Sequence, residues 1–445
     1  MTDQPPENPS AEDNPDAEQP EEPTQDKDGG VATESRDDVP GRVTYGRAFL
    51  DALTTANSGT VTVLALVLAL LVGAVIIVFS DEAVLATFQY LFARPTDALY
   101  AVGDSVGGAY GALFKGSIVN FETLGAAFRG EVPWERALDP ISETLTNSAP
   151  LIFTGLAVTL AFRAGLINIG GEGQAIMGAI AAGMVGFLLH LPPVIHLLAA
   201  LVAGAIAGGM YGFVPGWLKA RTGAHEVITT IMLNHIAKFF LGWLLLRELV
   251  QRPEKSNAIS KVVDENAMLP KLAGEVLRVN LGIVLAIFAA LVVGWILQRS
   301  TLGFELRAVG SNPDAARTAG MSVNRAYMVA MMLAGGFAGL GGAAMLLGPA
   351  GSLTPAVVAG IGFDGITVAL LGRGKPVGTV LAGLLFGALQ AGAVGMQGQD
   401  VPVDMVTILQ ALIVLFIAAP ALVKAVFRLR EQRAAGFGPT LAKGW

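Results

Sequence analysis

The chain lacks cysteine and is poor in charged and aromatic residues. Over 445 residues, charged side chains make up 15% and aromatic side chains 7%. The missing cysteines exclude a disulfide framework and a thiolate metal site. A globular domain has about 25% charged residues, so a chain this poor in charge and 53% hydrophobic is not expected to be soluble. The mean hydropathy of +0.58 agrees with a membrane protein.

The chain also lacks the G-x-x-x-x-G-K-[ST] pattern with which many ATPases hold phosphates. We therefore predict that it is not an enzyme and has neither catalytic residues nor a cofactor of its own. If ATP drives it, a partner subunit must use the ATP and Mg²⁺. His225 and His235 lie on roughly opposite faces of one predicted helix without an acidic residue at ligand spacing, so no metal site is expected.

Apolar runs are the dominant feature of what the chain does contain. A membrane-spanning helix needs about 20 apolar residues, and about ten segments approach that length. They run over residues 60–79, 143–162, 166–189, 194–218, 226–246, 281–297, 326–347, 362–371, 377–394 and 403–423. The sequence thus predicts an all-α polytopic membrane protein with about ten transmembrane segments, including broken or short helices.

Composition divides the chain into four regions. Residues 1–41 carry 13 acidic residues and almost no apolar ones, which predicts a disordered acidic cytoplasmic tail. Residues 42–140 hold the first transmembrane helix and an external segment. Residues 141–430 form the main transmembrane domain with a cytoplasmic loop at 299–325, and residues 431–445 form a second cytoplasmic tail.

Basic residues gather in loops that share one side of the membrane if there are ten crossings. Since cytoplasmic loops are enriched in Lys and Arg, we predict a multi-pass protein of the cell membrane with both termini in the cytoplasm. The loop 250–280 opposes this topology, because it holds five basic residues on the predicted outer side.

Glycine, with 55 residues, recurs at intervals of four within the apolar runs. The series are Gly204, Gly208, Gly212 and Gly216, then Gly335 and Gly339, and Gly383 and Gly387. Such spacing leaves bare backbone along one helix face and favours close helix packing. We assign these glycines no substrate role.

Three polar interruptions break the apolar pattern. The first, residues 162–174, is rich in glycine and contains Asn168, Glu172 and Gln174. It predicts a re-entrant turn or a broken helix, where polar groups face protein or a water-lined cavity. Two structural alternatives remain: Arg163 reaches the cytoplasmic interface, and Glu172 and Gln174 cap the helix that follows.

The second interruption is residues 225–238. Glu226, Thr230, Asn234 and Lys238 recur every four residues and so form a polar stripe on an otherwise apolar helix. Because charged side chains are unfavourable in lipid, the stripe is expected to face a substrate pathway or a partner subunit. An internal network that fixes the position of the helix is an equally good interpretation.

The third interruption is residues 360–367, which include Phe363 and Asp364. It matches the dinucleotide pattern G-x-G-x-x-G, but no strand precedes it, so the match is accidental. It is better interpreted as the start of a half-helix that ends before Gly372. Asp364-Gly-Ile-Thr echoes Glu226-Val-Ile-Thr at another helix start, which suggests inverted repeats.

The predicted cytoplasmic loop contains a short helix signal. Asn312 is suited to cap the helix, Pro313 to its first position, Asp314 to its positive end and Gly320 to its termination. A short helix outside the membrane is suited to docking into a soluble partner.

These segments resemble the membrane (permease) subunits of bacterial ATP-binding-cassette importers of the nucleoside and simple-sugar type. That group shares a superfamily with ribose and branched-chain amino acid permeases. The segments that carry the resemblance are 149–156 through 168–174, 226–234, 306–320 and 362–390.

The resemblance implies a transport subunit for nucleosides or related ribose-containing or simple sugars, with ATP hydrolysis in a separate subunit. It implies as partners an ABC ATPase, a second permease that is homologous or identical, an extracytoplasmic substrate-binding lipoprotein and membrane lipid, but no nucleic acid polymer. It also implies that 312–320 is the coupling helix to the ATPase. Its candidate contact residues are Asn312, Pro313, Asp314, Ala315, Ala316, Arg317 and Gly320.

The resemblance further implies a substrate pathway between two permeases, and polar side chains in the interrupted spans are its candidates. They are Asn147, Asn168, Glu172, Gln174, Glu226, Thr230, Asn234, Phe363, Asp364 and Gln390. The main alternative function is an ion-coupled secondary transporter of a small polar solute, suggested by Glu172, Glu226, His235 and Lys238. A structural or receptor-like membrane component without transport is a third possibility.

Overall fold

The described part of the chain is helical. The computed structural model describes residues 58–253, 257–358, 360–397 and 404–429. Within them the backbone forms helices and two isolated β-bridges, Gln251 with Ser260 and Lys271 with Asn280. The prediction of an all-α fold is confirmed. The tails predicted at 1–41 and 431–445 lie outside the described residues.

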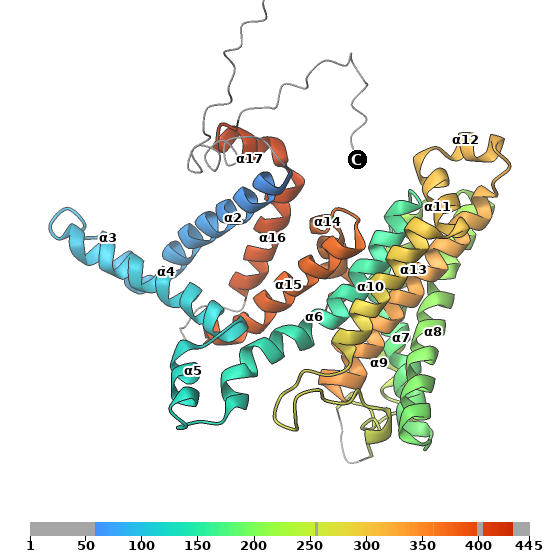
Figure 1. The fold of residues 1–445 in the computed structure, drawn as a ribbon, viewed down its shortest axis with the longest axis horizontal. Helices are drawn as coiled ribbons and strands as arrows, with labels where there is room; N and C mark the ends of the chain where they lie inside the picture. The colour runs from blue at the N-terminus through green and yellow to red at the C-terminus, as the bar shows by residue number, and fades with distance from the viewer. Residues whose placement is uncertain (1–57, 254–256, 359, 398–403, 430–445) are drawn as a thin grey trace, which may run out of the picture. The chain divides into compact units, whose positions relative to one another are not determined.

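Eight helices in this part of the chain are long and apolar enough to cross a membrane. They are α2 (Ser58–Ser80), α6 (Trp134–Arg163), α7 (Gly171–Leu188), α8 (Pro193–Thr222), α9 (Glu226–Leu244), α10 (Gly282–Arg299), α13 (Val323–Met345) and α15 (Pro376–Gln397). Each overlaps a predicted apolar segment (Figure 1). The polytopic prediction is therefore confirmed, although α6 begins at Trp134 and not near Glu143.

The two remaining predicted spans are irregular. Helix α14 (Ile361–Leu371) is shorter than a span, as predicted. The segment predicted as one span over 403–423 is instead α16 (Asp404–Ala418) and α17 (Pro420–Val426), bent by 89°. The break lies at Ala419, which has φ −114° and ψ 64°, because proline disfavours helical backbone in the residue before it. Broken helices are among those that the sequence predicts.

Three helices occupy the segment between α2 and α6. They are α3 (Glu82–Phe88), α4 (Pro95–Ser117) and α5 (Phe121–Phe128). The Asp81 carboxylate caps α3, and the Asn120 side chain caps α5. Helix α4 packs against α2 and α15, and its Tyr110 hydroxyl donates a hydrogen bond of 2.6 Å to the Leu70 carbonyl.

The predicted cytoplasmic loop 299–325 contains two helices, α11 (Thr301–Ser311) and α12 (Pro313–Thr318). Figure 1 shows α12 beyond the ends of α10 and α13, with α11 leading to it. The cap of α12 is confirmed, because Asn312 Oδ1 accepts the N–H groups of Asp314 and Ala315 at 3.0 and 3.1 Å. Helix α11 was not predicted, and the Ser300 hydroxyl caps it by accepting the Gly303 N–H at 2.9 Å.

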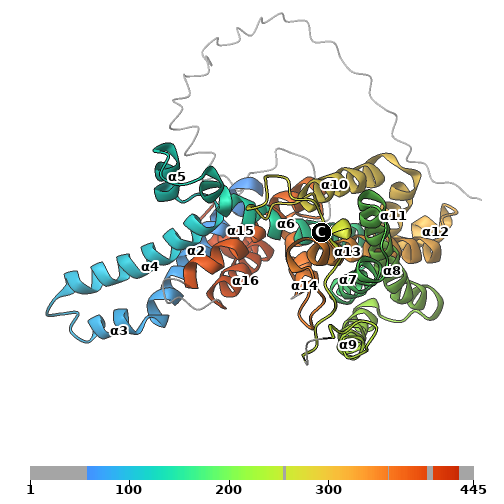
Figure 2. The same ribbon diagram turned by 90° about the horizontal axis from the view of Figure 1, so that it is seen from below.

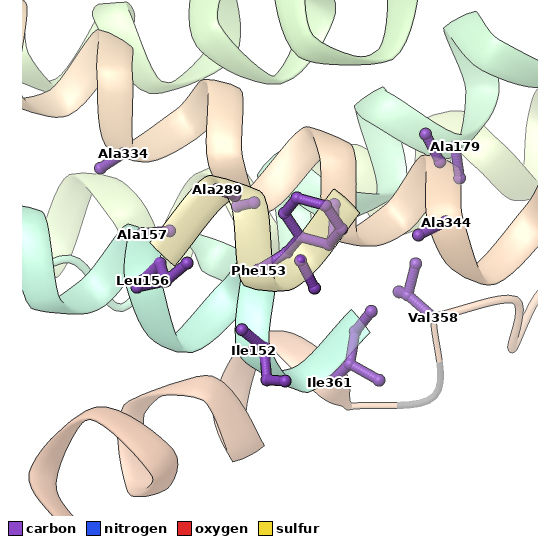
Figure 3. Close-up of a cluster of buried hydrophobic side chains, with 14 of the residues drawn as sticks. Ile152, Phe153, Leu156, Ala157, Ala179, Ala289, Ala334, Ala344, Val358 and Ile361 are labelled. Carbon is purple, nitrogen blue, oxygen red and sulfur yellow. The ribbon is translucent and has the colours of Figure 1, made fainter. Parts of the chain in front are cut away.

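The main hydrophobic core lies around α6. Ile152, Phe153 and Leu156 of α6 are almost fully buried, and Figure 3 shows them beside alanines of neighbouring helices and beside Val358 and Ile361. The alanines belong to α7, α10 and α13. A second core joins α2, α4, α15 and α16.

Helices α8 and α13 pack through backbone, as the glycine spacing predicts. A Cβ on Gly208 would lie against the Gly335 carbonyl oxygen and 2.6 Å from the Gly339 Cα. A Cβ on Gly212 would lie 2.9 Å from the Gly335 Cα. Because real Cβ atoms do not approach so closely, glycine is required at this crossing.

Beyond α13 the chain continues into a π-helical turn, η2 (Leu346–Ala350). Another segment at this end of α13, the loop between α9 and α10, contains the 3₁₀ turn η1 (Glu265–Ala267). The Leu269 N–H of this loop donates to the Leu347 carbonyl at 2.8 Å, and the Arg252 guanidinium donates to the Ser352 hydroxyl at 2.8 Å. These bonds join the two loops before the chain enters α14.

Candidate functional site

The first polar interruption is a true break between α6 and α7. Gly165 adopts the left-handed conformation, with φ +72°, and residues 166–169 are not helical. A Cβ on Gly165 would lie 3.0 Å from the Gly310 Cα of α11. The break that was predicted from sequence is confirmed, and it lies against the helix that precedes α12.

Arg163, the last residue of α6, joins two elements. Its Nε donates a hydrogen bond of 2.9 Å to the carbonyl of Gly374, in the turn between α14 and α15. The sequence suggested that this side chain reaches the cytoplasmic interface. The structure shows that it ties the end of α6 to the turn that follows the half-helix.

Asn168 and Gln174 form a buried amide pair inside the break. Asn168 Nδ2 donates to Gln174 Oε1 at 2.9 Å, and Gln174 Nε2 donates back to Asn168 Oδ1 at 3.2 Å. Asn168 Oδ1 also accepts the Gly170 N–H at 3.0 Å. Buried polar groups need such partners, and the pair fixes the entry into α7.

Glu172, in the first turn of α7, caps a different helix. Its two carboxylate oxygens each accept one N–H group, from Gly360 and from Gly362, both at 3.0 Å. These N–H groups belong to the start of α14, where unpaired donors and the helix dipole favour an anion. One interpretation of the sequence was that Glu172 and Gln174 cap α7. In the structure neither of these side chains caps the start of α7.

The starts of α7 and α14 touch through glycines. A Cβ on Gly362 would collide with the backbone of Glu172, and one on Gly171 would lie 3.2 Å from the Gly362 carbonyl oxygen. The other face of α14 is bound by α6, since the Thr154 hydroxyl donates to the Ile361 carbonyl at 3.0 Å. The two helix starts are therefore held as one packed unit.

Asp364, in the first turn of α14, pairs with α15. Gln390 Nε2 donates a hydrogen bond of 3.0 Å to Asp364 Oδ2. Asp364 lines a cavity of about 510 Å³ with Thr367 and Gln410, between α14 and α16. This cavity is distinct from the one that Glu172 lines.

The polar stripe of α9 is mostly buried. Glu226, Thr230 and Asn234 have exposed fractions of 5%, 0% and 7%, whereas Lys238 is exposed. Asn234 Oδ1 accepts the Gly173 N–H at 2.8 Å, and its Nδ2 donates to the Ile169 carbonyl at 2.9 Å. These bonds are the internal network that the sequence offered as one of two interpretations.

Glu226 lies at the start of α9 and is paired with α8. Lys219 Nζ donates to Glu226 Oε2 at 2.6 Å. The Thr230 hydroxyl donates to the Glu226 carbonyl at 2.7 Å, so its hydrogen-bond partner lies within α9. These two side chains hold the end of α9 in place and do not line the cavity described next.

A cavity of about 340 Å³ opens between α7, α9 and the segment that leads into α14. It is lined by Glu172, Ile176, Ile231, Asn234, His235, Lys238, Pro355, Ala356, Val358, Gly360 and Phe363. Its polar groups are a carboxylate, an amide, an imidazole and an ammonium, and Phe363 adds an aromatic ring that is 48% exposed. Such a mixture can hydrogen-bond and stack with a polar aromatic solute.

His235 and Lys238 lie near the middle of α9 and are exposed. A charged side chain at the centre of a transmembrane helix costs about 2.5–3.5 kcal/mol when it faces lipid. The sequence gave Lys238 a place on the stripe, whereas His235 was considered as a metal ligand and in the ion-coupled alternative but not as a pathway residue. His235 follows Ile231 by four residues, and Lys238 follows Asn234 by four. Because residues at this spacing share a helix face, both could have been predicted to line the cavity once one of its α9 residues was known.

Asn147 lies apart from the other predicted pathway residues. It lines a third cavity, of about 680 Å³, together with Lys115, Glu143 and Arg278. Arg278 and Glu143 form an ion pair of 3.1 Å across it. The predicted pathway residues thus divide among three cavities and the buried network, and the structure does not bring them into one site.

The predicted coupling residues form one exposed tip. Asp314 and Arg317 are exposed and form an ion pair of 3.1 Å on α12. Ala316 is buried, and α12 packs against α11 and α13. Ala315 and Pro313 complete the helix, and Gly320 turns the chain with φ +84°. The exposed surface of this helix thus carries both a carboxylate and a guanidinium.

Comparison with known proteins agrees with these features. Residues 141–418 match the family model described as branched-chain amino acid transport system / permease component. The chain is 38% identical over 335 residues to the guanosine ABC transporter permease protein NupP of Bacillus subtilis, which covers 75% of this chain and 91% of that protein. No solved structure matches the chain.

Two further relatives broaden the comparison. The glucose ABC transporter permease protein TsgB13 of Haloferax volcanii is 36% identical over 72% of this chain and 82% of its own length. The guanosine ABC transporter permease protein NupQ of Bacillus subtilis is 28% identical over 56% of this chain and 80% of its own length. NupP and NupQ are thus two permease proteins named for guanosine in one organism.

Proposed function

Because the chain belongs to the family of branched-chain amino acid transport system permease components, we propose that it is the membrane subunit of an ATP-binding-cassette importer for nucleosides. The observation that carries the substrate class is the 38% identity with the guanosine permease over 335 residues. The residues that line the 340 Å³ cavity all lie within 141–418, the region that the family model matches. An ion-coupled secondary transporter is not favoured by these relatives.

The cavity supports a nucleoside by its chemistry. A nucleoside is uncharged at neutral pH and joins a flat aromatic base to a ribose rich in hydroxyls. Phe363 offers a surface for stacking, and the exposed side chains of His235 and Lys238 offer groups that bind hydroxyls and amides. An importer that receives its substrate from a binding protein needs only weak affinity inside the membrane, so this sparse set is sufficient.

The partners follow from the same proposal. An ATPase subunit would bind α12 from the cytoplasm, an extracytoplasmic binding lipoprotein would deliver the substrate, and a second permease would complete the pathway. Since Bacillus subtilis has NupP and NupQ, and this chain is 38% identical to one and 28% to the other, we infer that the second permease is a related but different chain. Both termini would lie in the cytoplasm.

Uptake into proteoliposomes tests the function. The chain is reconstituted with its ATPase and second permease, and binding protein is added outside with radiolabelled guanosine or glucose. We expect guanosine uptake that needs ATP inside and exceeds glucose uptake. Glucose uptake without guanosine uptake would show that the substrate is a simple sugar. Uptake by this chain alone, driven by an ion gradient, would exclude an ATP-driven importer.

A further inference from the structure

A fourth cavity, of about 420 Å³, lies where α2, α16 and α17 meet the turn after α14. It is lined by Val61, Thr62, Leu370, Arg373, Ile417, Pro420 and Lys424. Among the described residues, none of these lines any of the three cavities described above. Figure 2 shows α2, α15 and α16 side by side, away from α8 and α12. The cavity is thus separate from the one proposed for the substrate.

The fourth cavity lies at the same end of the spans as α12. Arg373 is in the turn between α14 and α15, and the next residue, Gly374, accepts the hydrogen bond from Arg163 at the end of α6. The break that follows Arg163 lies against α11. Val61 is near the first residue of α2, and Ile417 is near the last residue of α16. Because apolar runs end where the hydrocarbon layer ends, the cavity lies at the membrane surface.

Helix α17 runs across the ends of the spans and not along them. It is bent by 89° from α16 (Figure 1). Leu422 and Val426, which are four residues apart, are 46% and 55% exposed, whereas Val423 is buried in the core around α2. Apolar side chains on the outer surface of such a helix are suited to the boundary between lipid headgroups and acyl chains. Helix α17 therefore brings Lys424 to the level of the headgroups.

Two cations line the fourth cavity from different elements. Arg373 Nη2 donates a hydrogen bond of 2.6 Å to the Thr62 hydroxyl of α2. This bond holds the guanidinium at the cavity wall, and an arginine side chain stays charged in proteins. Lys424 of α17 adds an ammonium. Among the described residues that line the cavity there is no acid, and the other four are apolar.

The backbone at Arg373 supports a role for its side chain. Its φ of +54° lies in the left-handed region, which residues other than glycine rarely adopt. Both neighbours are glycines, so Arg373 carries the only side chain of residues 372–374. An unfavourable conformation of this kind is expected where the side chain has a function.

We propose that the fourth cavity binds an anionic phospholipid of the leaflet on the α12 side. The phosphate lies between Arg373 and Lys424, because guanidinium and ammonium groups form charge-assisted hydrogen bonds with phosphate oxygens. An acyl chain follows the apolar wall that Val61 and Ile417 form. Basic pockets between membrane helices at the level of the headgroups are suited to anionic lipids.

A phospholipid fits this cavity better than a soluble anion. A free phosphate ion would contact the two cations but leave the apolar wall against water, whereas a phospholipid covers both. Helix α2 packs on α4, α16 and α17, and the bound lipid adds a further link from α2 to the turn after α14. The proposal is independent of the transported substrate, since it uses none of the residues that line the 340 Å³ cavity.

Native mass spectrometry of the purified full-length chain tests the proposal. Phosphatidylglycerol, phosphatidylcholine or inorganic phosphate is added in detergent, and the apparent Kd of the first bound molecule is measured. The test variant combines Arg373→Ala with Lys424→Ala. The control combines Arg299→Ala with Arg325→Ala, which also removes two positive charges. These two arginines are exposed and lie at the end of α10 and the start of α13, on the same side of the bundle.

We expect phosphatidylglycerol to bind the natural chain and the control equally well. It should bind the test variant roughly tenfold more weakly, because charge-assisted hydrogen bonds are lost. Arg373→Lys with Lys424→Arg keeps both charges and should keep the preference for phosphatidylglycerol over phosphatidylcholine. If the test variant does not fold, Lys424→Ala alone takes its place, since this side chain is half-exposed.

Three results would overturn the proposal. An unchanged Kd in the test variant would show that the two cations do not hold the lipid. Equal binding of phosphatidylcholine and phosphatidylglycerol by the natural chain would show that the site does not recognise an anionic headgroup. Displacement of phosphatidylglycerol by inorganic phosphate would assign the cavity to a soluble anion instead.

Discussion

At the scale of single residues, Glu172 shows how a half-buried acid can serve a helix other than its own. The helix dipole favours an acid in the first turn of α7, yet the carboxylate binds the first N–H groups of α14. Because the two helix starts lie side by side, one negative charge offsets the positive ends of both. This arrangement explains why an acid can be retained inside an apolar bundle.

Removing this carboxylate should loosen α14. Hydrogen bonds to a charged group contribute about 1.5–3 kcal/mol each, so Glu172→Ala is expected to speed hydrogen exchange at the start of α14 roughly tenfold or more. Glu172→Gln keeps one acceptor oxygen and should lie between Ala and the natural chain. Mass spectrometry of the peptide that contains residues 360–364 measures the effect.

Glu248→Ala serves as the control for this experiment, because Glu248 is exposed and lies in the loop after α9. It should leave exchange at α14 unchanged. Equal exchange in Glu172→Ala and the natural chain would show that the carboxylate does not hold α14.

The sequence predicts local features of this site well and distant pairings poorly. The glycines around Asn168 predict a break, and Asn312 before Pro313 predicts a capped helix, because both effects act over a few residues. Glu172 and Gly360 are 188 residues apart, and the same acid could equally have capped α7. Only the packing of α7 beside α14 decides between the two.

At the scale of elements, glycine spacing and proline set the helix contacts. The series from Gly204 to Gly216 predicts a close crossing, and α13 supplies the other half of it. Proline is less predictable, since Pro140 and Pro150 are accommodated inside α6 whereas Pro420 marks an 89° bend. The difference depends on whether neighbouring helices hold the chain straight, which the local sequence does not specify.

The α8–α13 crossing gives a prediction about stability. Gly208→Ala places a Cβ against the backbone of α13, and overpacking of this kind costs about 1–3 kcal/mol. We expect a lower unfolding temperature in detergent by scanning fluorimetry. Gly242→Ala on α9 is the control, because no atom lies within 4 Å of its Cβ position, and it should unfold as the natural chain does or slightly later.

Helix α12 gives a prediction about coupling. Asp314→Lys removes the ion pair with Arg317 and puts a positive charge at the positive end of the helix. If α12 transmits the action of the ATPase, guanosine uptake should fall at least tenfold while the unfolding temperature of the bundle stays the same. Uptake and ATP hydrolysis are measured together in proteoliposomes.

Asp104→Lys provides the comparison, since Asp104 is an exposed acid on α4 and the charge change is identical. It should transport normally. If Asp314→Lys transports as well as Asp104→Lys, α12 does not carry the coupling.

At the scale of the whole molecule, the apolar segments predict where the long helices lie better than they predict which helices pack together. Each long span was located from hydropathy, because burial of about 20 apolar residues is a property of one segment. Which spans lie together, and that α9 stays at the edge, depend on contacts between segments far apart in the chain. The stripe of Glu226, Thr230 and Asn234 was ambiguous for this reason, and the structure buries it against α7.

The orientation of the chain in the membrane can be tested directly. Asp314→Cys introduces the sole thiol, so a membrane-impermeant maleimide reports which side α12 occupies. We expect labelling in inside-out vesicles and none in intact cells until the membrane is permeabilised. Labelling of intact cells would place α12 outside, beyond the reach of a cytoplasmic ATPase, and would refute the proposed topology.

The contact between Gly165 and Gly310 has a mechanical consequence. Gly310 precedes the cap of α12 by two residues, and Gly165 opens the break that leads to Asn168 and Glu172. Because no side chain lies between these two glycines to absorb displacement, a tilt of α12 would reach the cavity wall over a very short distance. The two segments would then move together as one rigid unit. A methyl group added at either glycine would change how far the cavity wall moves for a given movement of α12.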